Sequence, residues 1–201
     1  MPGREELVTR ALLESGALLL GEFRLASGAV SHVYVDLRRV LSSPRHFRLL
    51  ASLLAGEVAE VAAAHEFTVA GVATGGIPWA TAVALELGVP LAYVRPPKGH
   101  GTGRSVEGAN VRGADVVLVD DVATTGGSLL ESARSLLSEG AASVRAVVIV
   151  DREQGASRAL GAVGVPLRSV VSLRSVLNEA FREGAITKER LDVITRELWG
   201  A

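Results

Sequence analysis

One stretch, residues 116–128, limits most strongly what this chain can fold into and bind. It begins with an apolar run of the kind found in buried parallel strands, and we expect this strand to end at the two carboxylates Asp120 and Asp121. A loop of small residues follows, and then a helix is expected over residues 129–139. Open α/β sheets bind ligands where a strand ends in such a loop before a helix. The pattern therefore predicts a ligand site here.

The loop itself has the chemistry of an anion site. Hydroxyl groups and closely spaced backbone N–H groups at a helix amino terminus favour a bound anion such as a monophosphate. The ionised carboxylates are acceptors that suit a vicinal diol, with or without a metal ion. Phosphate and diol together describe a ribose 5-phosphate. The alternative is a solvated acidic turn in which the hydroxyl side chains cap the helix. The loop residues are Thr124, Thr125, Gly126, Gly127 and Ser128.

A second loop of the same kind follows the strand expected over residues 68–73. Backbone donors without side chains in the way suit a second anion, although a simple strand-to-helix turn would have the same sequence. Another strand, over residues 143–150, precedes Arg152, whose guanidinium suits a carboxylate unless it is merely paired with Asp151 or Glu153. The residues of the second loop are Ala73, Thr74, Gly75 and Gly76.

Residues 95–108 form a long glycine-rich stretch without helical periodicity, which we expect to be a loop. It carries the cations Arg95, Lys98, His100 and Arg104, so it suits closure over an anionic leaving group. A solvated basic loop is the alternative.

The stretch from Asp120 to Ser128 resembles the phosphoribosyl diphosphate (PRPP) binding motif of type I phosphoribosyltransferases. The resemblance implies that Asp120 and Asp121 hold the ribose hydroxyls, that the loop after them holds the 5-phosphate, and that residues 73–76 hold pyrophosphate. The residues of the motif are Asp120, Asp121, Val122, Ala123, Thr124, Thr125, Gly126, Gly127 and Ser128.

Two further segments resemble orotate phosphoribosyltransferases: K-x-H-G at Lys98 to Gly101, and V-D-R-x-x-G at Val150 to Gly155. The resemblance implies that Arg95, Lys98 and His100 contact the diphosphate in the neighbouring subunit of a homodimer with shared active sites. It also implies that Arg152 and Thr124 orient orotate, and that Mg2+ is held mainly through PRPP, without direct protein ligands. The residues implied in catalysis are Lys98, His100 and Asp121.

The amino-terminal part resembles the same family through F-x-L-x-S-G-x-x-S-x-x-Y-x-D, from Phe23 to Asp36. In that family this segment forms part of a hood over the base. Tyr34 could stack on orotate or pack in the core of an ordinary hairpin. The family has a lysine where this chain has Ala26, so that group is absent here or supplied elsewhere.

The expected fold is α/β: a parallel sheet flanked by helices, type I phosphoribosyltransferase-like and Rossmann-like, with a small amino-terminal hood. We expect one domain over residues 1–201, with a hood from about residues 1–40 plus the carboxy-terminal helices, and a core over about 41–173. The first helix is expected from Arg4 towards Gly21, and Leu177, Ala180 and Phe181 are expected in the core.

Composition excludes several other classes. A net charge of −1 provides no electrostatic attraction to nucleic acid or an anionic membrane, and without cysteine there is no thiolate chemistry. The four histidines do not fall at metal-ligand spacing, and the charged first residues indicate no signal peptide, so a cytoplasmic protein is expected.

Taken together, the motifs predict an orotate phosphoribosyltransferase that uses PRPP and Mg2+ in pyrimidine (UMP) biosynthesis. Two alternatives remain open. A phosphoribosyltransferase for another base would keep residues 120–128 but would not need the Lys98 and His100 loop together with Arg152. A non-catalytic PRPP-sensing regulator would add a nucleic-acid surface, and no recognition helix or basic patch indicates one.

Overall fold

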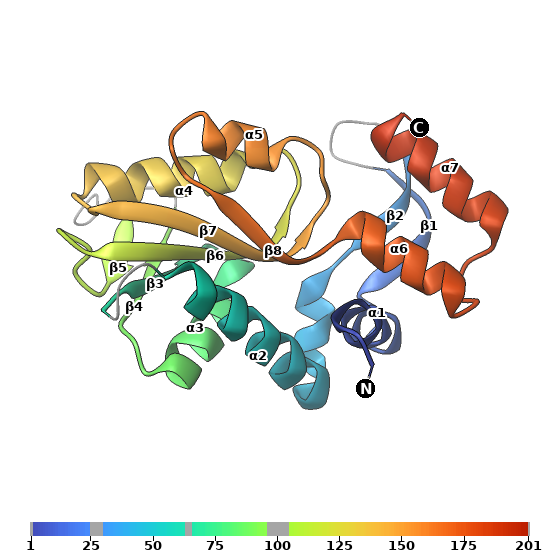
Figure 1. Ribbon diagram of the computed structural model, residues 1–201, viewed down its shortest axis with the longest axis horizontal. Helices are drawn as coiled ribbons and strands as arrows, with labels where there is room; N and C mark the ends of the chain where they lie inside the picture. The colour runs from blue at the N-terminus through green and yellow to red at the C-terminus, as the bar shows by residue number, and fades with distance from the viewer. Residues whose placement is uncertain (1, 25–29, 63–65, 96–104, 201) are drawn as a thin grey trace. The chain divides into compact units, whose positions relative to one another are not determined.

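The computed structural model describes residues 2–24, 30–62, 66–95 and 105–200. Its contacts divide the chain into two compact units, which are Ala51–Val170 and the pair of segments Met1–Leu50 and Val171–Ala201 (Figure 1). The single domain expected from the sequence stays a prediction.

The elements follow one another in the order labelled in Figure 1. The helices are α1 (Arg4–Glu14), α2 (Pro44–Val61), α3 (Gly76–Leu87), α4 (Gly127–Ser138), α5 (Ala156–Gly161), α6 (Leu173–Arg182) and α7 (Lys188–Trp199), with the short 3-10 helix η1 (Leu37–Ser42). The strands are β1 (Leu18–Arg24), β2 (Val30–Val35), β3 (Thr68–Val72), β4 (Leu91–Val94), β5 (Val106–Gly108), β6 (Asp115–Ala123), β7 (Ser143–Asp151) and β8 (Leu167–Ser172).

The larger sheet has the strand order β5-β4-β3-β6-β7-β8. Strand β3 pairs in parallel with β4 on one side and β6 on the other, and β6 pairs in parallel with β7. The expected parallel sheet is confirmed for these central strands, and one edge adds an antiparallel strand, because β5 runs antiparallel to β4. This strand lies in the segment 95–108 that was expected to be a loop, and it is only three residues long, too short for periodicity to indicate it.

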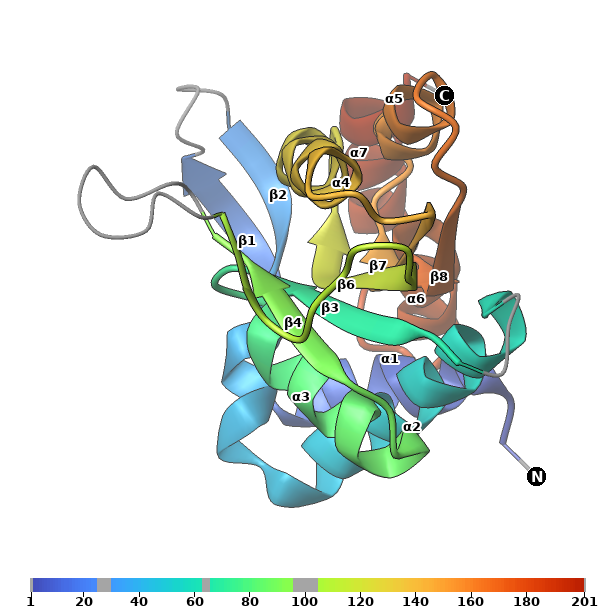
Figure 2. The ribbon, with the colours of Figure 1, turned by 90° about the vertical axis from the view of Figure 1, so that its left-hand side faces the viewer.

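Helices cover both faces of this sheet, as expected. Helices α4 and α5 lie on one face, and α3 lies on the other together with the part of α2 that belongs to this unit, residues 51–61 (Figures 1 and 2). Every residue of β3 is buried, which explains why this strand is apolar on both faces. Leu118 of β6 and Leu136 of α4 are fully buried in one apolar cluster, so side-chain burial holds α4 on the sheet.

Helix α3 approaches β3 unusually closely at Gly71. A Cβ atom at Gly71 would lie 2.9 Å from the Cβ atom of Ala80 and 3.0 Å from the Cα atom of Ile77. The absence of a side chain therefore sets the distance between the strand and the helix, and with it the position of the loop that joins them.

The other unit contains the hairpin of β1 and β2, which pair antiparallel with Leu18 opposite Val35. The first helix was expected to continue through Leu18, but it ends at Glu14. Gly16 has a φ of 66°, which ends the helical path, and the following leucines pair with β2 instead. Helix propensity describes one segment at a time, so it does not reveal that these leucines pair with the next strand.

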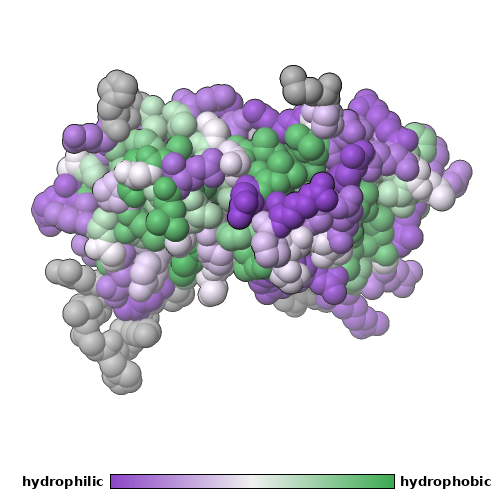
Figure 3. All heavy atoms as spheres, turned by 90° about the horizontal axis from the view of Figure 1, so that it is seen from below, coloured by the Kyte–Doolittle hydropathy of each residue, from purple (hydrophilic) through white to green (hydrophobic). Residues whose placement is uncertain are grey.

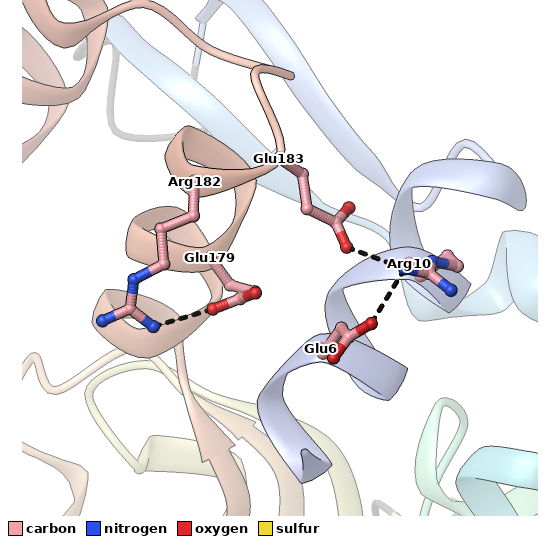
Figure 4. Close-up of polar contacts among 5 residues, drawn as sticks. All are labelled: Glu6, Arg10, Glu179, Arg182 and Glu183. Atoms are coloured by element: carbon pink, nitrogen blue, oxygen red, sulfur yellow. Dashed lines mark hydrogen bonds and ion pairs between the residues drawn. The ribbon is translucent and has the colours of Figure 1, made fainter. Parts of the chain in front are cut away.

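Segments from the two ends of the chain pack together within this unit, where α1 lies against α6. Arg10 of α1 contacts Glu6 at 3.0 Å and Glu183, which follows α6, at 3.3 Å, while Arg182 contacts Glu179 (Figure 4). These pairs are exposed to solvent and contribute little to stability.

The expectation that Phe181 lies in the core was wrong, because its side chain is 40% exposed. Its neighbour Ala180 is buried on the same face of α6 as Leu173, Val176 and Leu177. The residue after Ala180 points about 100° away from that face, so it reaches solvent. Elsewhere, no helix in the described part of the chain is both long and apolar enough to cross a membrane.

We expect Gly71→Ala to lower the free energy of unfolding by about 1–3 kcal/mol, because the new methyl group overpacks the contact with α3. Urea denaturation measures this change. Gly56→Ala is the matched control: Gly56 lies inside α2 with no atom within 4 Å of the added Cβ, so alanine should stabilise the protein by about 0.5–1 kcal/mol. Equal stability of the two variants would contradict the close packing of β3 on α3.

Candidate active site

The loops after β3 and β6 lie side by side at the carboxyl edge of the sheet, because these strands are parallel neighbours. Helix α3 leaves β3 towards one face of the sheet, and α4 leaves β6 towards the other (Figure 2). Two loops that part in this way leave a crevice at the edge of the sheet, which is the usual ligand position in open α/β folds. The two anion loops expected from the sequence are therefore adjacent.

The loop after β3 lies directly against the acidic pair. A Cβ atom at Gly75 would lie 2.8 Å from Oδ2 of Asp121, and one at Gly76 would lie 2.5 Å from the carbonyl oxygen of Val119 and 3.1 Å from Oδ1 of Asp120. The Ala73–Thr74 peptide bond is cis. A side chain at Gly76 would collide with the backbone of β6, and one at Gly75 would press on the Asp121 carboxylate, so the backbone of one predicted subsite lies against the carboxylates of the other.

Strand β6 continues two residues beyond the carboxylates at which it was expected to end. The sequence indicated that it ends at the two carboxylates, but Asp120 is still paired opposite Val148 and Ala123 opposite Asp151. The apolar pattern stops at Val119, whereas the backbone ladder continues because β7 is equally long. The carboxylates are thus held on a strand. Oδ1 of Asp120 accepts the N–H of Asp121 at 2.9 Å, and Oδ1 of Asp121 accepts the N–H of Val122 at 2.8 Å.

The loop after β6 surrounds a cavity of about 170 Å³. Gly126 precedes α4 with a φ of 85°, and a Cβ atom there would lie 2.9 Å from the Cα atom of Ala156, so glycine is required. No described side chain caps this helix, which leaves its first N–H groups facing the cavity as anion donors. The lining residues are Asp120, Val122, Ala123, Thr124, Thr125, Gly126, Gly127, Ser128 and Leu129.

The two carboxylates differ in their surroundings. Asp120 is 8% exposed, whereas Asp121 is half-buried. Burial, and then the negative charge of Asp121, raises the pKa of Asp120 well above its ordinary value of 3.8. Hydrogen-bond donors from a ligand would favour the ionised form of Asp120 and so lower its pKa.

Arg152 lies on the same edge, one residue after β7. Its backbone N–H donates to the carbonyl oxygen of Ala123 at 2.9 Å, so it is adjacent to the start of the loop after β6, and its side chain is only 8% exposed. In the same turn, Oδ1 of Asp151 accepts the N–H of Glu153, which has a φ of 56°. The structure therefore brings Arg152 and Thr124 to neighbouring positions.

Arg95 follows β4 on this edge, and Nη2 of its side chain contacts Oε1 of Glu107 at 2.6 Å. Glu107 was not expected at this edge, because its short strand β5 was not predicted. The available signal was the pair of opposite charges on Arg95 and Glu107, which stand near the two ends of the segment 95–108.

The remaining predicted residues are not placed at this edge by the structure. Lys98 and His100, like Ala26 and Arg104, lie outside the described residues. Tyr34 belongs to β2 of the other unit, where its ring centroid lies 6.0 Å from that of Phe23, and its contact with a base stays a prediction. Among the described residues, no group of three or more histidine, aspartate or glutamate side chains could hold a metal ion.

Comparison with known proteins agrees with this geometry. A model of the phosphoribosyl transferase domain matches residues 36–165. The orotate phosphoribosyltransferase of Aeropyrum pernix is 46% identical over 87% of this chain and 93% of its own length. A crystal structure of orotate phosphoribosyltransferase from Aeropyrum pernix aligns with a TM-score of 0.76 and 42% identity, covering 87% of this chain and 99% of the other. The Mycobacterium tuberculosis H37Rv orotate phosphoribosyltransferase in complex with PRPP aligns with a TM-score of 0.70 and 31% identity, over 87% of this chain and 99% of the other.

We expect Asp120→Asn to stabilise the ligand-free protein increasingly as the pH rises from about 4 to about 8. A carboxyl whose pKa is raised by folding binds more protons in the folded state, so the wild type loses stability as the pH rises above 3.8. The amide of the asparagine variant does not titrate, so the variant keeps its stability over this pH range. Urea denaturation across the pH range measures it, and Glu131→Gln, which removes a charge from an exposed position, is the control. A pH-independent effect of Asp120→Asn would contradict the raised pKa.

Proposed function

Because the chain belongs to the phosphoribosyltransferase family, among its orotate phosphoribosyltransferases, we propose that it transfers the ribose 5-phosphate of PRPP to orotate. The products are orotidine 5'-monophosphate and pyrophosphate, in UMP biosynthesis. The observation that carries the proposal is the contact of the loop at Gly75 and Gly76 with Asp120 and Asp121. This contact brings a diol site and two anion sites together, and PRPP carries a matching diol, 5-phosphate and diphosphate.

In the proposed binding mode, the 5-phosphate lies in the cavity formed by residues 124–128 and accepts hydrogen bonds from the amino terminus of α4. The ribose hydroxyls donate to Asp120 and Asp121. The diphosphate lies against the backbone of Thr74, Gly75 and Gly76, where no side chain intervenes. The strand and loop geometry holds these groups before the substrate arrives, so little reorganisation is needed.

The reaction forms a bond between a ring nitrogen of orotate and the anomeric carbon of the ribose, and that nitrogen releases its proton to solvent. The bond from that carbon to the diphosphate oxygen breaks, and its electron pair leaves with pyrophosphate. Positive charge develops on the ribose and negative charge on the leaving group, so catalysis depends on position and electrostatics. Asp120 and Asp121 are suited to stabilise the ribose cation, and Arg95, with Lys98 and His100, to stabilise the diphosphate.

Mg2+ fits this site as a partner of the substrate. The acidic pair supplies oxygen ligands of the kind that Mg2+ prefers, and this ion usually keeps several waters and binds through few carboxylates plus substrate phosphates. We propose that Asp120 and Asp121 face the ion while PRPP carries it. The ion neutralises charge on the diphosphate when bound.

We propose that Arg152 binds the orotate carboxylate. A guanidinium is planar and offers paired donors, and the backbone of Arg152 is hydrogen-bonded to Ala123, which precedes Thr124 in the loop that lines the cavity. A cytoplasmic location likewise remains our proposal.

We also propose a homodimer whose interface includes α3. This helix carries Leu85, which is 80% exposed, and a surface helix that is apolar on all sides is usually covered by another element. Figure 3 views the molecule from the side of α2 and α3 and shows apolar residues at the surface among polar ones.

We expect light scattering to give twice the mass of the 20.9 kDa chain, and we expect Leu85→Glu to shift the measured mass towards that of the monomer. A monomeric wild type would contradict the dimer.

The decisive assay follows the ultraviolet absorbance of orotate with protein, PRPP and Mg2+, beside parallel reactions with uracil, adenine and hypoxanthine. Loss of orotate absorbance that requires PRPP and Mg2+ supports the proposal. Consumption of another base would overturn the choice of orotate, and PRPP binding without any reaction would indicate a PRPP-sensing regulator.

We expect Arg152→Gln to raise the KM for orotate by about tenfold or more, because the amide cannot pair with a carboxylate, while the KM for PRPP changes little. Steady-state kinetics with each substrate varied in turn measure both constants. Arg158→Gln, at an exposed position of α5, is the control and should change neither. An equal rise of both constants for Arg152→Gln would remove Arg152 from base recognition.

A further inference from the structure

The ladder of the hairpin formed by β1 and β2 is interrupted at one position. Its register shifts between Leu20 and Phe23 of β1, so two residues of β1 face one residue of β2, which is His32. The residues before and after His32 are paired across the hairpin, but His32 itself is not among the paired positions. A backbone N–H that is left out of a ladder needs an acceptor elsewhere.

Glu197 of α7 supplies that acceptor. Its Oε2 accepts the backbone N–H of His32 at 3.0 Å and lies 2.7 Å from Nδ1 of the same residue. Burial opposes the charge of Glu197, but its hydrogen bonds with Ser31 and His32 outweigh burial and keep the pKa of Glu197 below its ordinary value of 4.5. Glu197 is therefore ionised at neutral pH, and one carboxylate holds both the backbone and the imidazole of a single residue.

The position of Glu197 on α7 directs its carboxylate towards β2. Leu191 and Ile194 are the buried positions of this helix, and Glu197 follows at the same spacing of three residues. Helix α7 packs against β2 within one compact unit (Figure 1). The side chains of His32 and Glu197 are 34% and 22% exposed, so solvent screens this contact less than an ion pair on the outer face of a helix.

The hairpin depends on contacts of this kind. Strands β1 and β2 form a two-stranded sheet of their own, and such a sheet is only marginally stable unless another element packs against it. Tyr34 stands two residues after His32, and alternate residues of a strand point to the same face. The contact of Glu197 with His32 therefore fixes the part of β2 that carries the ring of Tyr34.

We propose that Glu197 and His32 are positioning residues for base recognition: they attach β2 to α7 and so hold the ring of Tyr34 in the orientation that stacks on orotate. The inference rests on the proposed function and on the predicted contact of Tyr34 with the base. It gives the carboxy-terminal helix a part in substrate recognition, although this helix lies beyond residues 36–165 that the family model matches.

The role of Glu197 is tested by Glu197→Ala. We expect the KM for orotate to rise about fivefold to tenfold while the KM for PRPP stays unchanged, because the groups proposed to bind PRPP belong to the loops after β3 and β6. Steady-state kinetics with each substrate varied in turn measure both constants. A general folding defect would not produce this difference between the two substrates.

Glu22→Ala is the matched control for this variant. The carboxylate of Glu22 also faces His32, at 4.0 Å from Nε2, but its side chain is 81% exposed. An exposed carboxylate at this distance contributes little, so both KM values should equal those of the wild type. An unchanged KM for orotate in Glu197→Ala, or an equal rise for both substrates, would overturn the positioning role.

The dependence on Tyr34 is tested by combining variants. Tyr34→Ala should raise the KM for orotate at least as much as Glu197→Ala does. Adding Glu197→Ala to Tyr34→Ala should raise it no further, because the ring that Glu197 positions is already absent. If the two effects instead multiply, Glu197 acts without Tyr34, and the proposal is overturned.

Hydrogen exchange measured by mass spectrometry separates this inference from the proposed function, because it needs no substrate. We expect residues 30–35 to exchange about tenfold faster in Glu197→Ala than in the wild type or Glu22→Ala. Faster exchange together with a wild type that consumes no orotate would overturn the proposed reaction but support the attachment of β2 to α7. Equal exchange in a wild type that consumes orotate would overturn the inference and leave the reaction intact.

Discussion

The contact between the glycine loop after β3 and the acidic pair of β6 is the constraint on which the site depends. A side chain at Gly75 would press on the carboxylate of Asp121, and one at Gly76 would collide with the backbone at Val119. The two loops can therefore share one edge of the sheet only because one of them has no side chains there. The same constraint acts within β3, where the absence of a side chain at Gly71 lets α3 approach the strand. Glycines thus set the distances between elements that must meet a single ligand.

Burial and charge then give the two carboxylates different properties. Asp120 is enclosed by the strand ladder, and its pKa rises through burial and through the charge of Asp121, while Asp121 stays half-buried beside the pyrophosphate loop. Keeping a carboxyl group in this position costs stability at neutral pH. A ligand that donates hydrogen bonds to it offsets that cost, so the site is more stable occupied than empty. A carboxyl group in a crevice whose pKa is raised by burial and by a neighbouring charge is typical of a functional site.

Several site residues could be identified from sequence because their chemistry is local. The acidic pair, the hydroxyl-rich loop and the glycines of residues 73–76 each lie within a short segment, and the expectation of a helix-flanked sheet was confirmed along with the family. The errors involved residues whose state depends on distant partners: the pairing of Leu18 with β2, the edge strand β5, and the exposure of Phe181 on α6. Periodicity describes one segment at a time and carries no information about such partners.

The family and the kind of chemistry could be read from the residues alone: which loop offers donors suited to an anion, and which carboxylates suit a diol. These expectations follow from residue types at short spacing, where a helix terminus or a glycine has the same physical effect in any fold. Which of these groups meet depends on how the strands pair. Pairing of β3 with both β4 and β6 brings Ala73, Asp120 and Arg95 to one edge, although nearly fifty residues separate the first two. It also placed Glu107 on Arg95, because a hydrogen-bonded ladder depends on distance in space and not on distance along the chain.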